Sequence, residues 1–239
     1  MSHPTRYLGD ESLLDNPIWH SLATAHAHLA LERGLARRYP SEIGPLSGLR
    51  ATTQEAFADL AAIIPEGDLA VLFLPEETEI PPGWQLLREG TLVQMVCRTS
   101  PASPSISAEI LPLQTADFPE MAALAALTEP GPFRANTASL GGFLGIRVDG
   151  RLAAMAGQRL APTGFAEISA VCTHPDFRGR GHAQALVAAV AREIHQNGRI
   201  PFLTSFEANS GAIRVYEQVG FVPRRRFQLA VVKPQLLTP

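Results

Sequence analysis

Apolar and polar residues alternate in short runs through the second half of the chain, and these runs take turns with segments of helical spacing. Alternation with a period of two predicts strands, whereas apolar residues three and four positions apart predict a helix. The pattern predicts strands at residues 110–113, 143–148, 152–160, 166–173, 200–206 and 226–232. Helices are expected at residues 117–126, 183–196 and 209–219. This order is typical of an α/β (α+β) fold, in which helices pack on a sheet.

The first part of the chain follows a different pattern. Apolar positions spaced between Trp19 and Leu35, together with Pro17, predict a helix over residues 17–38, because proline is common in the first turn of a helix. A second helix is expected over residues 53–64 and a short strand over residues 69–74. Residues 84–97 predict two strands that are joined by a hairpin turn at Glu89-Gly90.

A proline- and serine-rich stretch separates the two patterns. Residues 99–105 read Thr-Ser-Pro-Ala-Ser-Pro-Ser and show no apolar period. Such composition is typical of linkers between domains. We therefore expect an N-terminal α/β region over residues 1–103 and a second domain over residues 104–239.

The overall composition narrows the class of protein. Hydrophobic residues make up 46% of the chain and charged residues 18%, which is typical of a globular protein. The formal net charge of −3 gives no general attraction to nucleic acid or to anionic lipid, so neither is expected as a partner. No apolar run approaches the length of a membrane span, and acidic residues interrupt the N-terminus, so a cytoplasmic protein is expected.

Histidine and cysteine residues do not form a metal-binding pattern. His20, His26 and His28 lie in the predicted first helix, where no two of them are four positions apart to hold one ion. Cys97 and Cys172 are far apart and have no metal-like spacing around them. We expect no metal site and no disulfide framework.

Two glycines mark the junction between the strand at 166–173 and the helix at 183–196. The stretch Phe177-Arg-Gly-Arg-Gly-His-Ala183 provides residues without a Cβ at positions 179 and 181, so a ligand can approach the backbone closely. The N–H groups of a helix start and the positive end of its dipole favour an anion such as a pyrophosphate. The turn is therefore a candidate anion site, although a glycine turn by itself is also a common connection.

A second motif downstream makes the interpretation specific. Residues 209–221 read Asn-Ser-Gly-Ala-Ile-Arg-Val-Tyr-Glu-Gln-Val-Gly-Phe, which matches the pattern NxxAxxxYxxxGF. The glycine turn matches (Q/R)xxGx(G/A) through Arg178, Gly181 and Ala183. Together the two motifs resemble those of the GNAT superfamily of N-acetyltransferases, and the resemblance covers residues 109–239. It implies a mixed sheet, splayed open beside the cofactor.

The resemblance also implies a cofactor and the residues that bind it. The expected cofactor is acetyl-CoA or another acyl-CoA, with its pyrophosphate on the glycine turn and its pantetheine arm along the strand before the turn. Arg224-Arg225-Arg226 is interpreted as a solvated strand edge or as a patch near the 3′-phosphate of this cofactor. Asn209 orients the cofactor or caps its helix. The expected cofactor-binding residues are Val171, Cys172, Thr173, Arg178, Gly179, Arg180, Gly181, His182, Ala183, Asn209, Ala212 and Tyr216.

The chemistry of acyl transfer to an amine requires a base and an acid. A primary amine with a pKa of ~10 must lose a proton before it attacks, directly or through water. Glu167, six residues before Thr173, matches the position of the catalytic glutamate in histone-acetylating relatives, with Glu207 and His174 as alternatives. The resemblance assigns Tyr216 as the general acid that protonates the departing thiolate. Unless a bulge intervenes, strand alternation places Glu167, Ser169, Val171 and Thr173 on one face.

The expected reaction is direct attack by a small-molecule or peptide amine in a ternary complex, catalysed by a monomer or homodimer. The alternative function is a catalytically inactive module that binds acyl-CoA and serves regulation or interaction. A P-loop nucleotide hydrolase is excluded, because no Gly-Lys-Ser/Thr follows the turn. Residues 1–103 are expected to be a degenerate copy of the same fold, as in tandem and glycine-N-acyltransferase-like members, or to wall the acceptor cleft.

Overall fold

The computed structural model describes residues 9–75, 78–102 and 108–235. Within them the chain forms five α-helices and two sheets, one of three strands and one of eight. The helices are α1 (Pro17–Ala23), α2 (Gln54–Ala61), α3 (Phe118–Thr128), α4 (His182–Gln196) and α5 (Ser210–Val219). The small sheet contains β1 (Leu31–Arg33), β2 (Ala36–Arg38) and β3 (Ser47–Leu49). The large sheet contains β4 (Ala70–Leu74), β5 (Trp84–Val96), β6 (Ile110–Leu113), β7 (Phe143–Val148), β8 (Arg151–Gln158), β9 (Phe165–Thr173), β10 (Ile200–Phe206) and β11 (Val222–Pro234).

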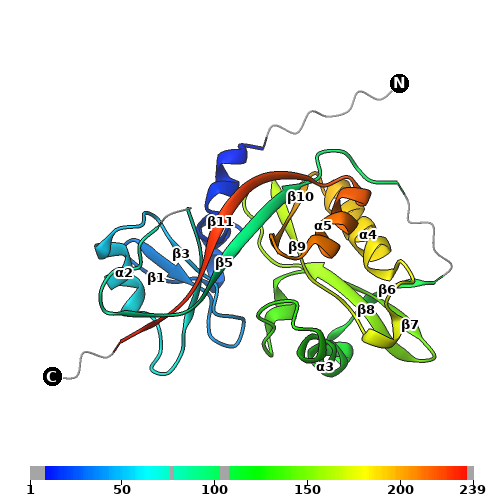
Figure 1. The fold of residues 1–239 in the computed structure, drawn as a ribbon, viewed down its shortest axis with the longest axis horizontal. Coiled ribbons are helices and arrows are strands. Elements are labelled where there is room, and N and C mark those ends of the chain that lie inside the picture. Colours follow the sequence, from blue (N-terminus) through cyan, green and yellow to red (C-terminus); the bar gives the residue numbers. More distant parts are fainter. Residues whose placement is uncertain (1–8, 76–77, 103–107, 236–239) are drawn as a thin grey trace.

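The large sheet has the strand order β4-β11-β5-β10-β9-β8-β7-β6 and is mixed. Its only parallel pair among the strands described is β9 with β10, and the neighbouring pairs are antiparallel. Figure 1 shows the sheet between α4 and α5 on one side and α3 on the other. The α/β (α+β) class and the mixed sheet flanked by helices are therefore confirmed.

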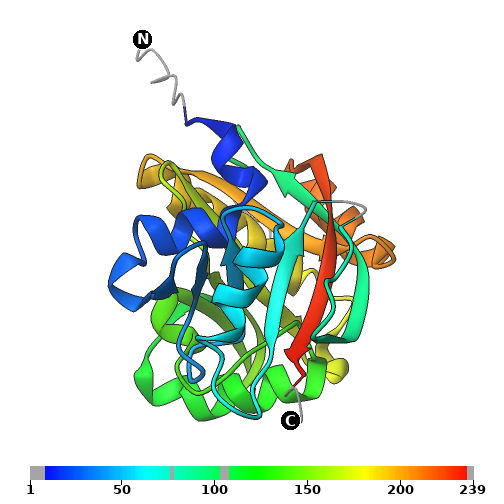
Figure 2. The ribbon, with the colours of Figure 1, turned by 90° about the vertical axis from the view of Figure 1, so that its left-hand side faces the viewer.

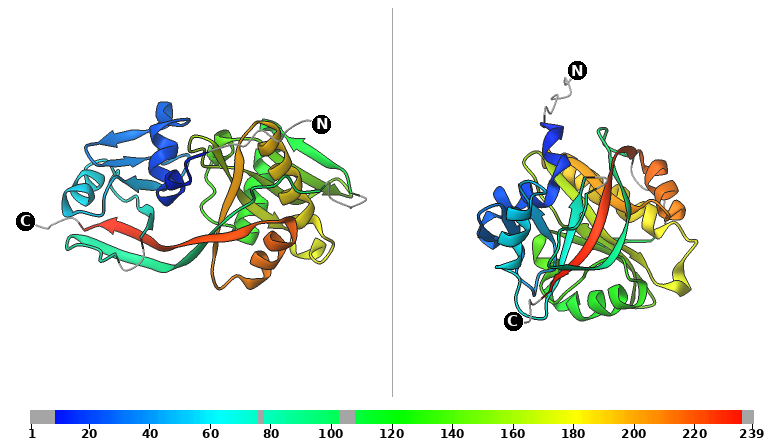
Figure 3. Two further views of the ribbon diagram at one scale, coloured as in Figure 1. Left: turned by 90° about the horizontal axis from the view of Figure 1, so that it is seen from above. Right: turned by 60° about the vertical axis from the view of Figure 1, so that its left-hand side comes forward.

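The two 13-residue strands β5 and β11 connect the N-terminal and C-terminal halves of the molecule. They lie side by side along its length, as the view from above in Figure 3 shows. One end of β5 pairs with β10, and β4 extends the sheet beyond β11. Residues from both halves therefore share one sheet. The predicted boundary between residues 103 and 104 lies outside the described residues, and the degenerate-copy interpretation stays a prediction.

The predicted helix over residues 17–38 is wrong beyond Ala23. There the chain forms a short 3-10 turn and then the hairpin of β1 and β2, which packs with α2 in the N-terminal half (Figure 2). Gly34 turns the hairpin with a φ of 46°, and the adjoining Leu35 N–H donates to Asp59 Oδ2 at 2.8 Å. Arg38 is fully buried and pairs with Asp68 at 2.7 Å. These tertiary contacts outweigh the local helix propensity.

The predicted hairpin turn at Glu89-Gly90 is also wrong, because β5 continues through it. Gly90 lies opposite Leu229 of β11 without a positive φ, so the backbone there is extended. A Cβ on Gly90 would lie 3.1 Å from the ring of Phe206, which indicates that this glycine makes room for a side chain rather than a turn. By contrast, Asp149 and Gly150 have φ values of 50° and 79° and form the predicted hairpin between β7 and β8.

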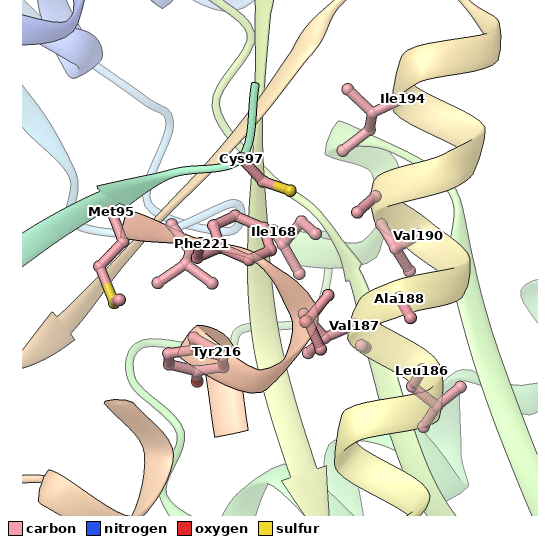
Figure 4. Packing of buried hydrophobic residues seen from close by; sticks show 14 of the residues in the cluster. Met95, Cys97, Ile168, Leu186, Val187, Ala188, Val190, Ile194, Tyr216 and Phe221 are labelled. Carbon is pink, nitrogen blue, oxygen red and sulfur yellow. The ribbon is translucent and has the colours of Figure 1, made fainter. Parts of the chain in front are cut away.

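Buried apolar residues form a core on each face of the C-terminal part of the sheet. Figure 4 shows one of them, where Leu186, Val190 and Ile194 of α4 lie beside residues of α5 and β9. On the opposite face, Met121 and Leu124 of α3 pack against β7, β8 and β9. The two cores hold the ends of β9 and β10 between layers of helices.

The three consecutive arginines of β11 pair with acidic residues instead of forming an open edge. Arg224 Nη2 contacts Asp15 at 2.7 Å, and Arg225 Nη1 contacts the same carboxylate at 3.0 Å. Arg226 pairs with Glu207 at 2.7 Å. Arg224 and Arg225 therefore hold the N-terminal segment against β11, and Arg226 holds the loop between β10 and α5. The interpretation as a solvated edge or as a patch near the 3′-phosphate stays a prediction.

Candidate functional site

The large sheet opens between β9 and β10. Their parallel pairing begins at Phe165 and Ile200 and ends at Ile168 and Leu203. Beyond that point, residues 169–173 and 204–206 have no ladder between them, and a cavity of about 750 Å³ lies there. The GNAT-like motifs implied a splayed sheet, and the sheet is splayed at β9, the strand that precedes the glycine turn.

A β-bulge shapes the strand at the edge of this cavity. Ser169 lies opposite Gly157 and Cys172 opposite Met155, so two residues of β9 face one residue of β8. Ala170 has a φ of 50°, which is a strained conformation for a residue with a Cβ. Such strain persists where the surrounding structure imposes it, often at functional sites.

The bulge places on opposite faces of β9 residues that simple alternation would place on the same face. Ala166 and Ile168 contact the core beneath α4 and α5, and after the bulge Val171 contacts that same core. Ala170 and Cys172 contact the core beneath α3. The expectation that Glu167 shares a face with Val171 therefore does not hold, because the bulge changes the period of two between them.

The glycine turn lies at the start of α4 with its backbone exposed. Gly179 and Gly181 have φ values of 76° and 77°, and Gly181 is the N-cap residue. No side chain caps this helix start, so its first N–H groups point out of the helix without a side-chain acceptor. Arg178 and Arg180 are exposed, and each guanidinium donates to a backbone carbonyl of the same segment at 3.4 Å.

Two buried polar groups beside the turn have no partner among the described residues. They are both ring nitrogens of His182 and the hydroxyl of Thr173, which lines the cavity. Burial and the nearby Arg180 lower the pKa of His182, so its neutral form is favoured. Buried polar atoms are normally hydrogen-bonded, so a ligand with polar groups would fit at this place.

Helix α5 supplies the other side of the cavity. Asn209 caps the helix through its Oδ1, which accepts from the N–H of Ala212 at 3.2 Å. Tyr216 lines the cavity, is 9% exposed and packs edge-on against Phe221, with ring centroids 6.4 Å apart (Figure 4). Burial raises the pKa of Tyr216 to about 12, so its hydroxyl keeps its proton at neutral pH. Of the two roles expected for Asn209, the capping bond is present.

Glu167 is buried beneath the cavity in a two-point ion pair. Arg159 donates to its carboxylate through Nε at 2.7 Å and through Nη2 at 2.9 Å. Thr204 Oγ1 donates to Glu167 Oε1 at 3.2 Å. Both Arg159 and Thr204 line the cavity, so they connect the fully buried carboxylate to it.

The two alternative bases lie away from the lining of this cavity. His174 accepts from the N–H of Asp176 at 3.3 Å and contacts Arg151 at 3.2 Å. Glu207 pairs with Arg226. In the part of the chain that the structure describes, neither side chain belongs to the cavity wall.

The N-terminal half supplies an apolar wall to the same cavity. Five of its six side chains come from the β4-β11-β5 portion of the sheet, where the register places Val231 beside Val71 and Leu229 beside Phe73, and the sixth, Leu46, precedes β3. We call this surface the apolar wall, and it consists of Leu46, Val71, Phe73, Leu92, Leu229 and Val231. Arg88 lies at its margin, with its guanidinium 4.8 Å from the centroid of the Phe206 ring. Residues before 104 therefore contribute directly to the site.

Comparison with known proteins now identifies the family. The family model described as FR47-like protein matches residues 143–228. A solved structure from Novosphingobium aromaticivorans DSM 12444, assigned to the GNAT family of acetyltransferases, is 38% identical with a TM-score of 0.85, over 93% of this chain and 99% of that one. The chain belongs to the GNAT family.

More distant GNAT structures share the fold. A GCN5-related N-acetyltransferase from Kribbella flavida is 17% identical with a TM-score of 0.58, over 88% of this chain and 94% of that one. A GCN5-related N-acetyltransferase-like protein from Streptococcus suis 89/1591 is 14% identical with a TM-score of 0.62, over 91% and 92%. No curated protein matches the sequence.

Most of the residues predicted from the GNAT motifs meet at one place. Those that line the cavity are Val171, Cys172, Thr173, Ala183, Asn209, Ala212 and Tyr216. Residues 178–181 form the exposed turn that adjoins it, and His182, the first residue of α4, is buried beside the turn. The sequence interpretation missed Arg159, Thr204 and the apolar wall, because no motif marks these positions and only the fold brings them together from separate elements.

Within residues 9–75, 78–102 and 108–235, no helix is long and apolar enough to cross a membrane. The same ranges hold no group of three or more histidine, cysteine, aspartate or glutamate side chains placed to bind a metal ion.

Proposed function

We propose that this GNAT protein transfers an acetyl group from acetyl-CoA, or an acyl group from another acyl-CoA, to a primary amine. In this reaction the carbon–sulfur bond of the thioester breaks and a carbon–nitrogen bond forms. The amine loses one proton and the departing sulfur gains one. The observation that carries the proposal is the opening between β9 and β10, which has an uncapped helix start at its edge and Tyr216 in its wall.

The residues around the opening fit an acyl-CoA substrate. The N–H groups at the start of α4 suit a pyrophosphate, and the absence of a Cβ at Gly179 and Gly181 leaves room for it. Beyond Ile168 the edge of β9 has no strand on its β10 side, so its backbone can pair with the amides of a pantetheine arm, as an added strand would. The buried hydroxyl of Thr173, without a partner among the described residues, fits a polar group there.

Tyr216 is the proposed general acid. Its hydroxyl carries a proton throughout the physiological range, because burial raises its pKa to about 12. It can therefore donate a hydrogen bond to the sulfur as negative charge develops on it.

Glu167 is the proposed base, and it acts through Thr204. The carboxylate does not line the cavity, whereas the Thr204 hydroxyl does and donates to Oε1 at 3.2 Å. A proton taken from the amine by the hydroxyl can pass to the carboxylate as the hydroxyl gives up its own. Arg159 keeps the carboxylate in one orientation through its two hydrogen bonds.

The proposed attack is direct, within a ternary complex of protein, acyl-CoA and amine, because the cavity reaches from α5 to the apolar wall. The cytoplasmic location and the monomeric or homodimeric state stay predictions from the sequence.

Calorimetric titration with acetyl-CoA and an assay of free thiol release in the presence of mixed amines test the proposal together. Binding together with amine-dependent thiol release supports the transferase. Binding without release over a broad amine panel would instead indicate the inactive acyl-CoA-binding module. Absence of binding of acetyl-CoA and of every longer acyl-CoA tested, at millimolar concentration, would refute both.

A further inference from the structure

Two arginines that belong to neither cofactor motif line the cavity. Arg159 follows the end of β8 directly, and Arg88 belongs to β5. We infer that the amine acceptor is an otherwise apolar molecule with one carboxylate, which Arg159 and Arg88 hold. This inference rests on the proposed function. A hydrophobic amino acid, or a molecule of that chemistry, meets this description.

Arg159 has one edge of its guanidinium available to a ligand. Its Nε and Nη2 are used by Glu167, at 2.7 and 2.9 Å. Its Nη1 makes no hydrogen bond with any residue in the described part of the chain. The side chain is 11% exposed, and it lines the cavity, so Nη1 and its two N–H groups are held rigidly where a ligand can reach them. A planar guanidinium fixed in this way suits a carboxylate.

Arg88 adds a second positive charge at the margin of the apolar wall. Its guanidinium lies over the Phe206 ring at 4.8 Å, and its neighbour in the register is Val231 of that wall. Phe206 lines the cavity as well. A ligand that packs on the wall therefore places its polar end within the field of this arginine.

The balance of charge in the cavity lining favours an anionic acceptor over a polycationic one. The lining carries two arginines and a single carboxylate, that of Glu129, while Glu167 lies behind Arg159. A polyamine or an amino sugar with several ammonium groups would need several carboxylates there to balance its charge. Hydroxyls of Ser169, Thr204 and Ser205 provide hydrogen-bonding groups without charge.

The apolar wall defines the remainder of the acceptor. Its six aliphatic or aromatic side chains come from β4, β5, β11 and the segment before β3, and they enclose the cavity beyond the end of β10. Such a surface binds a branched aliphatic or aromatic group, because burial of that group removes apolar area from water. An acceptor with both features has its amine between the wall and the thioester.

Matched acceptors test the inference without any mutation. L-leucine, L-leucinamide and 3-methylbutylamine share one apolar group, and only leucine carries a carboxylate. We expect kcat/KM for leucine to exceed that for each of the other two by about tenfold or more, the effect of a hydrogen bond to a charged group. The amide has the less basic nitrogen and thus more free amine at neutral pH, so amine basicity alone would favour the opposite order.

Variants then locate the carboxylate site. Arg88→Gln and Arg159→Lys should each move the leucine-to-leucinamide ratio of kcat/KM towards one. The lysine keeps a positive charge beside Glu167, so the fold is preserved, but it has no second edge for the ligand. Arg33→Gln is the control, since Arg33 is 62% exposed and pairs with Asp59 away from the cavity. It should leave the ratio unchanged.

The outcomes separate this inference from the proposed function. Equal or better use of 3-methylbutylamine and leucinamide would overturn the carboxylate site while it supported the transferase. Binding of acetyl-CoA with no acetylation of leucine or L-phenylalanine would also overturn it. Failure to bind acetyl-CoA or any longer acyl-CoA would refute the proposed function itself.

Discussion

Replacement of Tyr216 by phenylalanine removes one hydroxyl group and keeps the ring that packs against Phe221. The hydroxyl is placed in the wall of the cavity, and burial raises its pKa to about 12. A thiol has a pKa of ~8.5, so complete proton transfer to the thiolate from Tyr216, whose pKa is about 12, is uphill by several kcal/mol. Tyr216 therefore acts chiefly as a hydrogen-bond donor to the developing charge.

This role sets the expected size of the effect. We expect Tyr216→Phe to lower kcat by about 10²-fold, at the lower end of the range for general acids, which corresponds to about 2.7 kcal/mol of transition-state stabilisation. Affinity for acetyl-CoA should change little. Thiol release measured at saturating acetyl-CoA, with calorimetry for affinity, separates the two quantities.

Tyr39→Phe is the matched control for loss of a buried hydroxyl. The Tyr39 hydroxyl contacts Ser21 at 3.0 Å and His26 at 2.8 Å, and Tyr39 is outside the cavity wall. Its loss should lower stability by ~1 kcal/mol and leave kcat within about threefold. Unchanged turnover in Tyr216→Phe, or an equal loss in both variants, would refute the assignment of Tyr216 as the acid.

The remaining predictions concern the base, the ion pair, the glycine turn and pH. Glu167→Gln should lower kcat by about 10²-fold and flatten the rise of rate with pH, and Thr204→Val should reproduce part of this loss. An unaltered pH profile in both variants would exclude proton transfer through Thr204 to Glu167. Arg159→Ala should lower the free energy of unfolding in urea by ~3–5 kcal/mol, because it leaves a fully buried carboxylate unpaired, and a loss below about 1 kcal/mol would contradict that reasoning. Gly181→Ala and Gly198→Ala introduce a Cβ at φ values of 77° and 68° and should each cost ~1–2 kcal/mol of stability, but only the first should weaken acetyl-CoA binding in calorimetry. Because burial raises the pKa of Tyr216 from 10.0 to about 12, folding favours its protonated form. This contribution is complete below pH 10 and is lost as pH rises towards 12, so the free energy of unfolding of Tyr216→Phe should fall less over that window than that of wild type.

The C-terminal elements could be predicted from the sequence because their signals are local. Asp149-Gly150 specifies its hairpin, and Asn209 and Gly220 mark the two ends of α5. The cofactor motifs lie within single strand–turn–helix units, so their residues meet wherever those units fold. For this reason the sequence alone predicts the GNAT family and most of the motif residues that line the cavity.

The N-terminal half and the acceptor side depend on contacts between distant residues. Part of the helix expected over residues 17–38 is replaced by a hairpin, because Gly34 forms the turn and Arg38 pairs with Asp68. The bulge at Ala170 could not be predicted, because the residue with the positive φ there is not a glycine. The ion pair of Arg159 with Glu167 forms because β8 pairs with β9, and no local sequence pattern predicts it.

The central claim is that the opening between β9 and β10, with the glycine turn at its edge, binds the thioester of a pantetheine carrier. Calorimetric titration of the purified protein with acetyl-CoA tests it most directly. We expect saturable binding of one molecule per chain, weakened in Gly181→Ala and retained in Gly198→Ala. Absence of a binding isotherm at millimolar acetyl-CoA, or equal weakening in both glycine variants, would contradict it.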